Sequence, residues 1–369
     1  MLRPLMPEEA ISYLLEHALI ERRSIVSGSL SIRDVSRRNR SLIVDTHDER
    51  SLFLKQAVNS YDAECLSREA TLYSYLHRHR SGFNTHLVEL IHYDERRRIL
   101  VLGLVRDAIT ISAIHAHARY SARSVGSAFG RALAKLHEIV PDEAALPALR
   151  TARPWVLDAV HPTYSEYIAQ SAATRELARM IQARPNISKR FSVLSQAWAG
   201  DSVIHLDVKG GNVIKPKGQP INRCLKLIDW EFGGIGDPRW DVGSVFADYL
   251  LCWLLSFPAG GPVPLADLIP IARRPLPELQ GEIRAFWAIY AKLRKLDLRH
   301  SRTFLKGAIA YTAARLLQTA IELAQQRDSL NSLIFYLLQL ALNFIELPFE
   351  SALILIGLDS AAMESQGGE

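Results

Sequence analysis

The feature that most constrains this chain is the string HLDVKGGN at residues 205–212. It places Asp207 five positions before Asn212, and Gly210 and Gly211 between them allow a tight turn without a clash of β-carbons. A carboxylate can accept or orient the proton of a hydroxyl group, and an amide oxygen can complete the hard-oxygen shell of Mg²⁺. Both groups on one loop favour phosphoryl-transfer chemistry, although the string alone also fits a strand-turn-strand loop with incidental polar residues.

A second motif, LIDWE at residues 227–231, strengthens this interpretation. It is an apolar strand that ends in two acids, Asp229 and Glu231, and acids at this spacing suit a divalent metal. The interval from Asn212 is right for a β-hairpin that brings Asp229 beside Asn212. Asp229 is therefore predicted to bridge Mg²⁺ to a triphosphate, and two motifs in this order make a plain strand-end turn a poor explanation.

Lys55 is the third part of the pattern. It ends the apolar run LFLK, within a region of short β-like runs and polar turns at residues 24–58. A buried lysine is costly unless it meets an opposite charge, and Glu69 lies in the next predicted helix, at about 62–79. Kinases use such a lysine on the α- and β-phosphates and pair it with a helix glutamate. An edge-strand lysine in solvent is the alternative.

The order of the predicted elements divides the chain into two lobes. Three strand-like runs, a helix and two further strands before residue 105 give the order of a small nucleotide-binding lobe. The rest of the chain is predicted to be mainly helical, with a strand-like block at 203–241. We expect an N-terminal nucleotide-binding lobe at 1–105, a C-terminal catalytic and acceptor-binding lobe at 106–358, and a flexible tail at 359–369.

Composition narrows the location and the partners. Three widely separated cysteines and an N-terminus without a signal-like apolar core predict a cytoplasmic protein. The most apolar late stretches are shorter than the roughly 20 residues that span a bilayer, so no membrane partner is expected. The excess of positive charge concentrates in arginine-rich clusters without interleaved aromatic residues, which argues against a nucleic-acid partner.

Taken in order, Lys55, Glu69, HLDVKGGN, LIDWE and the string GDPRWD at 236–241 resemble the aminoglycoside phosphotransferase and choline kinase-like family. The resemblance spans roughly residues 20–250. It implies an α+β, bilobal, protein-kinase-like fold, with a small β-rich N-lobe, a larger helical C-lobe and ATP in the cleft. A cytoplasmic kinase that uses ATP and Mg²⁺ is the expected activity.

The resemblance also implies roles for individual residues. Asp207 would be the catalytic base, Asn212 and Asp229 the metal ligands, and Lys55 the phosphate anchor, paired with Glu69. A hinge that includes Leu102 and Leu104 would contact the adenine through backbone groups. In the string GDPRWD, Asp237 and Asp241 would be structural, tying the catalytic loop to the following helix.

Two departures from the family pattern are informative. The first hairpin lacks a glycine-rich phosphate loop and carries Arg38 at its tip, so Arg38 or backbone N–H groups are candidate phosphate contacts. Lys209 stands where small-molecule kinases of this family usually have histidine and where protein serine/threonine kinases have lysine. A lysine there can neutralise charge on the transferring phosphoryl group, and it favours a peptide hydroxyl as acceptor.

The acceptor remains open between classes. Residues 251–358 contain eleven Lys or Arg and eight Asp or Glu, which argues against a polycationic aminoglycoside. A quaternary ammonium could instead meet aromatic rings, although core packing explains these four equally well: Trp253, Trp287, Tyr290 and Tyr311.

Three functions follow from these observations. The first is phosphoryl transfer to the hydroxyl of a small molecule. The second is a Ser/Thr kinase of an acidic precursor peptide, because SRRNRSLIVD and FLKQ resemble stand-alone kinases of lanthipeptide-type pathways. The third is a pseudokinase-like nucleotide-binding module. The presence of a suitable residue at every catalytic position argues against this third function.

Overall fold

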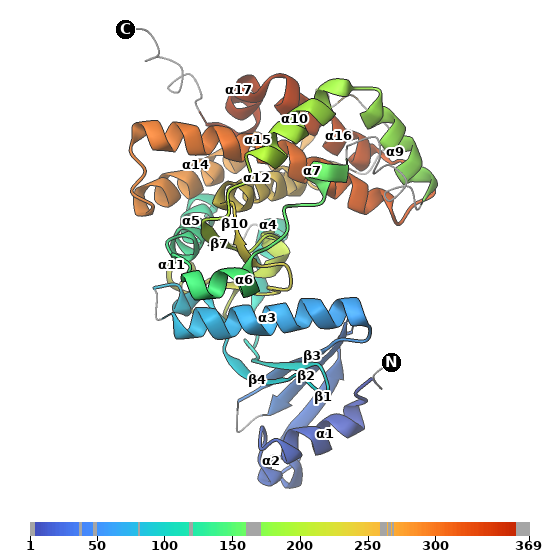
Figure 1. Ribbon diagram of the computed structural model, residues 1–369, viewed down its shortest axis with the longest axis vertical. Coiled ribbons are helices and arrows are strands. Elements are labelled where there is room, and N and C mark those ends of the chain that lie inside the picture. The colour runs from blue at the N-terminus through green and yellow to red at the C-terminus, as the bar shows by residue number, and fades with distance from the viewer. Residues whose placement is uncertain are drawn as a thin grey trace.

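The computed structural model describes residues 4–36, 39–46, 50–79, 82–117, 121–159, 171–258, 264, 267 and 269–358. Two predictions, a phosphate contact by Arg38 and a flexible tail at 359–369, lie outside the described residues. The described chain forms a small lobe on an antiparallel sheet and a larger, mainly helical lobe, which follow one another along the long axis (Figure 1). The predicted α+β class is confirmed.

The small lobe is built on a five-stranded antiparallel sheet of order β1-β2-β3-β5-β4. Its strands are β1 (Leu30–Asp34), β2 (Arg40–Thr46), β3 (Leu52–Gln56), β4 (Leu90–Asp94) and β5 (Ile99–Gly103). The helices of this region are α1 (Pro7–Glu16), α2 (Arg22–Val26) and α3 (Ser60–Arg78). In the register of β3 and β5, Lys55 lies opposite Leu100 and Phe53 lies opposite Leu102.

Alternation along β5 explains why both faces of this sheet are covered. Ile99 and Val101 belong to the apolar cluster that includes residues of α1, whereas Leu100 and Leu102 belong to the larger cluster that includes residues of α3. Successive side chains of a strand point to opposite faces, so an uninterrupted apolar run requires cover on both sides. The sheet is therefore fixed between α1 and α3.

Helix α3 lies between the sheet and the helical lobe (Figure 1). It begins after Asn59, whose side-chain oxygen accepts the backbone N–H of Asp62 at 2.8 Å and caps the first turn. The helix predicted at about 62–79 is therefore confirmed, with its start two residues earlier. Its buried face holds Glu69 among apolar residues, which sets up the ion pair described below.

The large lobe contains most of the helices. They are α4 (Ile111–His117), α5 (Ala122–His137), α6 (Leu146–Leu149), α7 (Val156–Ala159), α9 (Ala172–Gln182), α10 (Pro185–Gln196), α11 (Ile221–Cys224), α12 (Pro238–Leu254), α14 (Leu276–Leu293), α15 (Leu298–Ala324), α16 (Ser332–Glu346) and α17 (Pro348–Ser351), with a π-helical turn at Ala352–Ile356. Short 3₁₀ turns lie at Asn84–His86, Glu143–Ala145, Gly210–Asn212 and Ile269–Ile271. Among the described residues, none of the helices is both long and apolar enough to cross a membrane.

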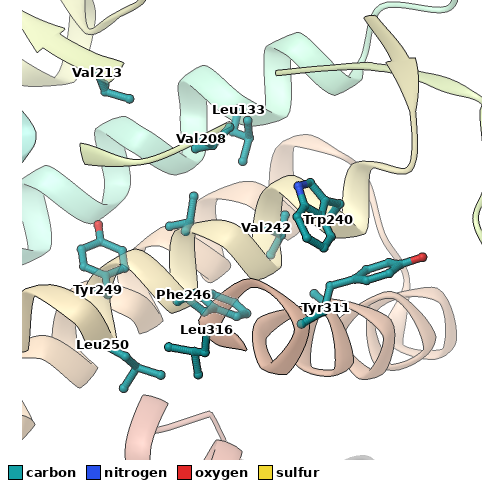
Figure 2. Packing of buried hydrophobic residues seen from close by; sticks show 14 of the residues in the cluster. Leu133, Val208, Val213, Trp240, Val242, Phe246, Tyr249, Leu250, Tyr311 and Leu316 are labelled. Atoms are coloured by element: carbon teal, nitrogen blue, oxygen red, sulfur yellow. The ribbon is translucent and has the colours of Figure 1, made fainter. Parts of the chain in front are cut away.

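A continuous apolar core joins these helices. Figure 2 shows Trp240, Phe246 and Leu250 of α12 beside Tyr311 and Leu316 of α15. All five side chains are almost completely buried, and the Trp240 and Tyr311 rings meet edge to face, 5.7 Å between centroids. This core fixes α15 against α12, and α12 follows directly from the motif region.

Two glycines let α5 and α14 approach closely. Gly126 and Gly130 are four residues apart on α5, so they lie on one face of the helix. A β-carbon at either position would collide with the backbone carbonyl of Glu282 or of Phe286 on α14. The two helices therefore pack at a separation that larger side chains would not allow.

Short strands form the predicted strand-like block at 203–241. They are β7 (Ser202–Ile204), β8 (Val213–Lys215), β9 (Lys226–Leu227) and β10 (Gly234–Gly236). A further short strand earlier in the chain, β6 (Ile109–Thr110), pairs with β8. Val213 pairs with Leu227 in the β8–β9 hairpin, and the Ile228 N–H donates to the Asn212 carbonyl at 3.0 Å. The hairpin predicted from the spacing of the two motifs is thus present.

Candidate active site

The loop at 205–212 connects β7 to β8 and is held in place by hydrogen bonds to α12. The Asp241 carboxylate accepts the backbone N–H of His205 at 2.7 Å and that of Leu206 at 2.9 Å. Leu206 has φ of 68°, a left-handed conformation that is rare for a bulky side chain. Because Asp241 is completely buried, these two charge-assisted hydrogen bonds are strong enough to hold the loop in that strained form.

His205 organises the same loop from the other side. Its Nε2 donates to the Ile228 carbonyl at 2.9 Å, and its ring lies 4.5 Å from the Trp230 ring. Asp229, between these two residues, also has a left-handed backbone, with φ of 66°. The loop and the LIDWE strand end are therefore locked together, and both strained residues flank the candidate reaction centre.

Asp207 lies at the centre of a cluster of donors. Its Oδ2 accepts from the Lys209 ammonium at 2.6 Å and from Asn212 Nδ2 at 3.0 Å. Its Oδ1 accepts from Arg315 Nη2 on α15 at 2.9 Å. The side chain is 16% exposed, so the carboxylate is oriented by the protein but still partly accessible.

Lys55 joins the sheet to this cluster. Its ammonium lies 2.8 Å from Glu69 Oε2, 2.7 Å from Asp229 Oδ1 and 3.6 Å from Glu231 Oε2. Burial alone would lower the pKa of Lys55, but the three carboxylates outweigh it and raise the pKa. Lys55 is therefore a permanent cation at the inner end of the cleft.

The two acids closest to Lys55 respond differently to their surroundings. Burial raises the pKa of Glu69, and the charge of Lys55 only partly opposes this effect. Burial acts in the same direction on Asp229, but the charge and hydrogen bond of Lys55 prevail and hold the pKa of Asp229 below its usual value. Asp229 is thus anionic at neutral pH, as a metal ligand must be.

The donor set beside Asp229 fits Mg²⁺. Asn212 uses its Nδ2 to donate to the Asp207 backbone carbonyl and carboxylate, both at 3.0 Å, so its Oδ1 is the atom that could bind a metal ion. Within the described residues, no three His, Cys, Asp or Glu side chains converge on one metal position. Mg²⁺ usually takes only one or two protein ligands and completes its octahedron with phosphate and water, so Asn212 and Asp229 suffice.

A cavity of about 560 Å³ opens from Lys55 towards the hinge between the lobes. Its polar lining includes Lys55, Glu69, Asn212, Asp229 and Glu231. Its apolar lining includes Val35, Ile43, Phe53, Val88, Leu102, Leu104, Val105, Ile214 and Ile228. A concave site with apolar walls at one end and convergent charges at the other suits a flat base joined to phosphates.

At the hinge, the structure shows which backbone N–H groups are already hydrogen-bonded within the protein. Leu102 and Leu104, for which an adenine contact is predicted, both line the cavity. However, the Leu104 N–H donates to the Ser51 carbonyl at 2.9 Å and the Gly103 N–H donates to the Glu89 carbonyl at 2.8 Å. A base would therefore meet the side chains of Leu102 and Leu104, and not these two amides.

The structure brings together six of the predicted site residues around one cleft: Lys55, Glu69, Asp207, Lys209, Asn212 and Asp229. Sequence reasoning missed Arg315, which follows Asp207 by 108 positions. It also missed Asp248 on α12, whose Oδ2 accepts the Gly210 N–H at 2.8 Å. No spacing rule in the sequence marks either residue, because both come from the interior faces of long helices.

Three of the four aromatic residues considered for a quaternary ammonium are engaged in the core. The Tyr290 hydroxyl lies 2.8 Å from His137 Nδ1, and the Tyr311 hydroxyl donates to Asp237 at 3.1 Å. Trp253 is fully buried. Core packing, the second explanation for these rings, is therefore the correct one for all three.

Comparison with known proteins matches this geometry. A sequence model of the family described as "Phosphotransferase enzyme family" matches residues 32–269. A search of curated proteins finds no match.

Similar solved structures include three kinases. A choline kinase from Cryptosporidium parvum superposes with a TM-score of 0.61 at 12% identity, covering 95% of this chain and 99% of that one. An ethanolamine kinase from Plasmodium vivax gives 0.56 at 12% identity, with 93% and 89% covered. The Streptococcus pneumoniae choline kinase LicA gives 0.51 at 14% identity, with 90% and 99% covered. At these identities the likeness concerns the fold, which is of the protein-kinase-like kind.

Proposed function

Because the chain belongs to the phosphotransferase enzyme family and is a kinase, we propose that it transfers the γ-phosphate of ATP to a hydroxyl group of a small molecule, with Mg²⁺ as cofactor. The observation that carries the proposal is the convergence of Lys55, Asp229 and Asn212 on the cavity, with Asn212 hydrogen-bonded to the Asp207 carboxylate. Positioning and charge neutralisation are what phosphoryl transfer requires from a protein. A cytoplasmic location, which the three free cysteines favour, is part of the proposal.

In this proposal Lys55 holds the α- and β-phosphates, and Glu69 keeps the ammonium aimed into the cleft. Asn212 and Asp229 hold Mg²⁺, which, when bound, neutralises phosphate charge and polarises the phosphorus–oxygen bonds. Leu102 and Leu104 enclose the base in the hinge, in the N-terminal lobe that we place at 1–105.

Asp207 accepts the proton of the acceptor hydroxyl. A bond forms between the acceptor oxygen and the γ-phosphorus, and the bond from the γ-phosphorus to the β–γ bridging oxygen breaks. The products are ADP and a phosphate ester, and the proton resides on Asp207 until water removes it. Lys209, 2.6 Å from Asp207, stabilises charge on the transferring group.

The direct test compares variants by the transfer of radioactive phosphate from labelled ATP. Asp207→Asn and Asp229→Ala are each expected to lower the turnover rate by about 100-fold or more. Asp328→Ala, at an exposed acid far along the chain, is the matched control and should keep the wild-type rate. Full transfer by Asp229→Ala would refute the proposal.

The same experiment separates two other functions. A nucleotide-binding module would bind ATP with Mg²⁺ and show no turnover with any acceptor. A kinase of a precursor peptide would label a serine or threonine peptide and no small molecule. The contact of Lys209 with Asp207 is the observation that favours the peptide kinase.

A further inference from the structure

We propose that the acceptor is a small hydroxyl compound that carries a carboxylate or phosphate group, and that Arg315 binds this anionic group. The assignment deepens the phosphotransferase function proposed above and rests on it. It names an anionic substrate class for the acceptor side of Asp207, set by residues of α15, α12 and α14.

The guanidinium of Arg315 stands directly beside the candidate catalytic carboxylate. Arg315 Nη2 lies 2.9 Å from Asp207 Oδ1, whereas Lys209 occupies Oδ2 on the opposite side. Arg315 is 7% exposed, compared with 42% for Lys209, so it is the more deeply buried of the two cations beside Asp207. A hydroxyl that reaches Asp207 must therefore place the rest of its molecule close to a fixed positive charge.

The neighbouring turns of α15 complete a polar face. Gln318 and Glu322 follow Arg315 by three and seven positions, so all three share one side of the helix. Arg315 Nη1 lies 3.4 Å from Glu322 Oε1, and Gln318 Nε2 donates to the same oxygen at 2.8 Å. The Gln318 Oε1 atom is buried and has no partner among the described residues, so a donor such as a second hydroxyl of the acceptor would satisfy it.

The acids near this face are already engaged, so they do not form a site for a polycation. Asp248 accepts the Gly210 N–H, and burial raises the pKa of its carboxyl, which disfavours the anionic form. Glu282 pairs with Arg274 and with His115 Nε2, the latter at 2.8 Å. With Tyr290, Tyr311 and Trp253 in the core, neither an acidic cleft nor an aromatic cage is present here among the described residues.

Arg315 can exchange its hydrogen bond to Asp207 for hydrogen bonds to the acceptor. It makes a single hydrogen bond to Asp207, whereas a guanidinium binds a carboxylate or phosphate best through two parallel hydrogen bonds. Transfer of Arg315 from Asp207 to the acceptor anion leaves Oδ1 open to the hydroxyl, whose proton then goes to Asp207. Because Arg315 is so little exposed, the anion must lie within a few bonds of the hydroxyl, which a small hydroxy acid or sugar phosphate provides.

The test compares acceptors that share a carbon skeleton and differ in charge. Glycerate and sn-glycerol 3-phosphate are anionic, glycerol is neutral and 3-aminopropane-1,2-diol is cationic. The same sets are built from longer hydroxy acids, their amides and the matching amino alcohols, and an acidic serine peptide is included. Transfer from labelled ATP with Mg²⁺ is measured as kcat/KM. We expect anionic compounds to exceed their neutral counterparts by at least about tenfold and the cationic ones to be poorest.

Variants of Arg315 give a second readout. Arg315→Gln should raise KM for the anionic acceptor by at least about tenfold while KM for ATP stays unchanged, and Arg315→Lys should retain part of the preference. The double variant Arg315→Gln/Glu322→Gln leaves no unpaired carboxylate on α15 and serves if the single variant folds poorly. Thermal unfolding and ADP binding confirm that each variant is folded.

Each outcome decides the question. Preferred transfer to neutral, cationic or peptide hydroxyls, or an unchanged KM for the anionic acceptor in Arg315→Gln, overturns the anionic assignment and leaves the phosphotransferase function standing. Transfer to no compound of any class defeats both. Anionic preference that disappears in Arg315→Gln and survives in part in Arg315→Lys supports the assignment.

Discussion

The ammonium of Lys55 and the carboxylate of Asp229 lie 2.7 Å apart, although 174 positions separate them in the chain. Lys55 lies in β3 of the small-lobe sheet, one residue before its end, and Asp229 follows β9 of the strand-like block at 203–241. Glu69 shares the same ammonium at 2.8 Å. The two lobes thus meet in one ion cluster, in which Glu69 is the most deeply buried carboxylate.

Lys55→Met should destabilise the protein as well as abolish phosphate binding. The buried Glu69 carboxylate would lose its counter-ion, and breaking such a pair lowers the free energy of unfolding by about 3 kcal/mol or more. Lys55→Met/Glu69→Gln should recover most of that loss, because the completely buried carboxylate is replaced by a neutral amide, and should remain inactive. Urea unfolding and ATP binding measure the two effects, and a double variant as unstable as the single one would contradict the explanation.

Asp241→Asn should impair turnover more than nucleotide binding. The substitution weakens the hydrogen bonds that hold the His205 and Leu206 amides, so the loop relaxes from its left-handed form. We expect a loss of about 2 kcal/mol in unfolding free energy and a lower kcat with KM for ATP unchanged. Asp237, in the same motif, caps α12 and binds Arg239 instead of the loop. Asp237→Asn should therefore lower the unfolding free energy and leave kcat unchanged. Equal losses of kcat would argue against the positioning role of Asp241.

His86 should make stability depend on pH below neutrality. Its Nδ1 donates to the Leu225 carbonyl at 2.7 Å, and burial lowers the pKa of the ring from 6.5 to about 4. Between these values the unfolded chain binds a proton that the folded chain does not, so stability falls as pH decreases from about 6.5 to 4. The contribution amounts to roughly 3 kcal/mol over that window.

His86→Asn provides the comparison. The asparagine amide can replace the Nδ1 hydrogen bond and does not titrate, so all other acid-sensitive groups cancel in the difference between the two proteins. Unfolding free energies measured from pH 7 to 4 should converge, with the wild type losing its advantage as the pH falls. Two curves that stay parallel would show that His86 is not the titrating group.

Gly130→Ala should separate α5 from α14. Its β-carbon would collide with the Phe286 carbonyl, a backbone atom that cannot move without displacing the helix, and the expected cost is about 3 kcal/mol. Gly281→Ala is the matched control within α14, because its β-carbon would meet only the end of Arg284, at 3.9 Å. That variant should gain about 1 kcal/mol from helix propensity. Thermal melts of both proteins give the comparison, and similar effects would refute the close-packing argument.

The local motifs were readable from the sequence because their geometry is local. HLDVKGGN and LIDWE lie within one hairpin, and the pairing of Val213 with Leu227 brings Asp229 next to Asn212 as their spacing predicts. The alternation and periodicity of apolar residues gave the sheet of the small lobe and helix α3. The proposed division of the lobes at residue 105 and the catalytic roles remain predictions for the experiments above.

The hinge and the helical lobe show where sequence reasoning ends. The Leu104 N–H donates to the Ser51 carbonyl, and this hydrogen bond depends on how the chain leaves β5. The aromatic residues that could have formed a cage turned out to be core residues, because α12, α14 and α15 bury the faces that carry Trp253, Tyr290 and Tyr311. Helical periodicity identifies an apolar face but does not specify which neighbour covers it.

The sequence by itself determined the class of chemistry: a carboxylate, an amide and a second carboxylate on one hairpin, with a lysine from a preceding sheet. Only the tertiary structure decided what surrounds Asp207, because Arg315 comes from a helix 108 positions later and meets it through the packing of α15 on α12. Local spacing follows from backbone geometry, whereas contacts between distant helices follow from the burial of whole faces. The charge of the acceptor site depends on these contacts between distant helices.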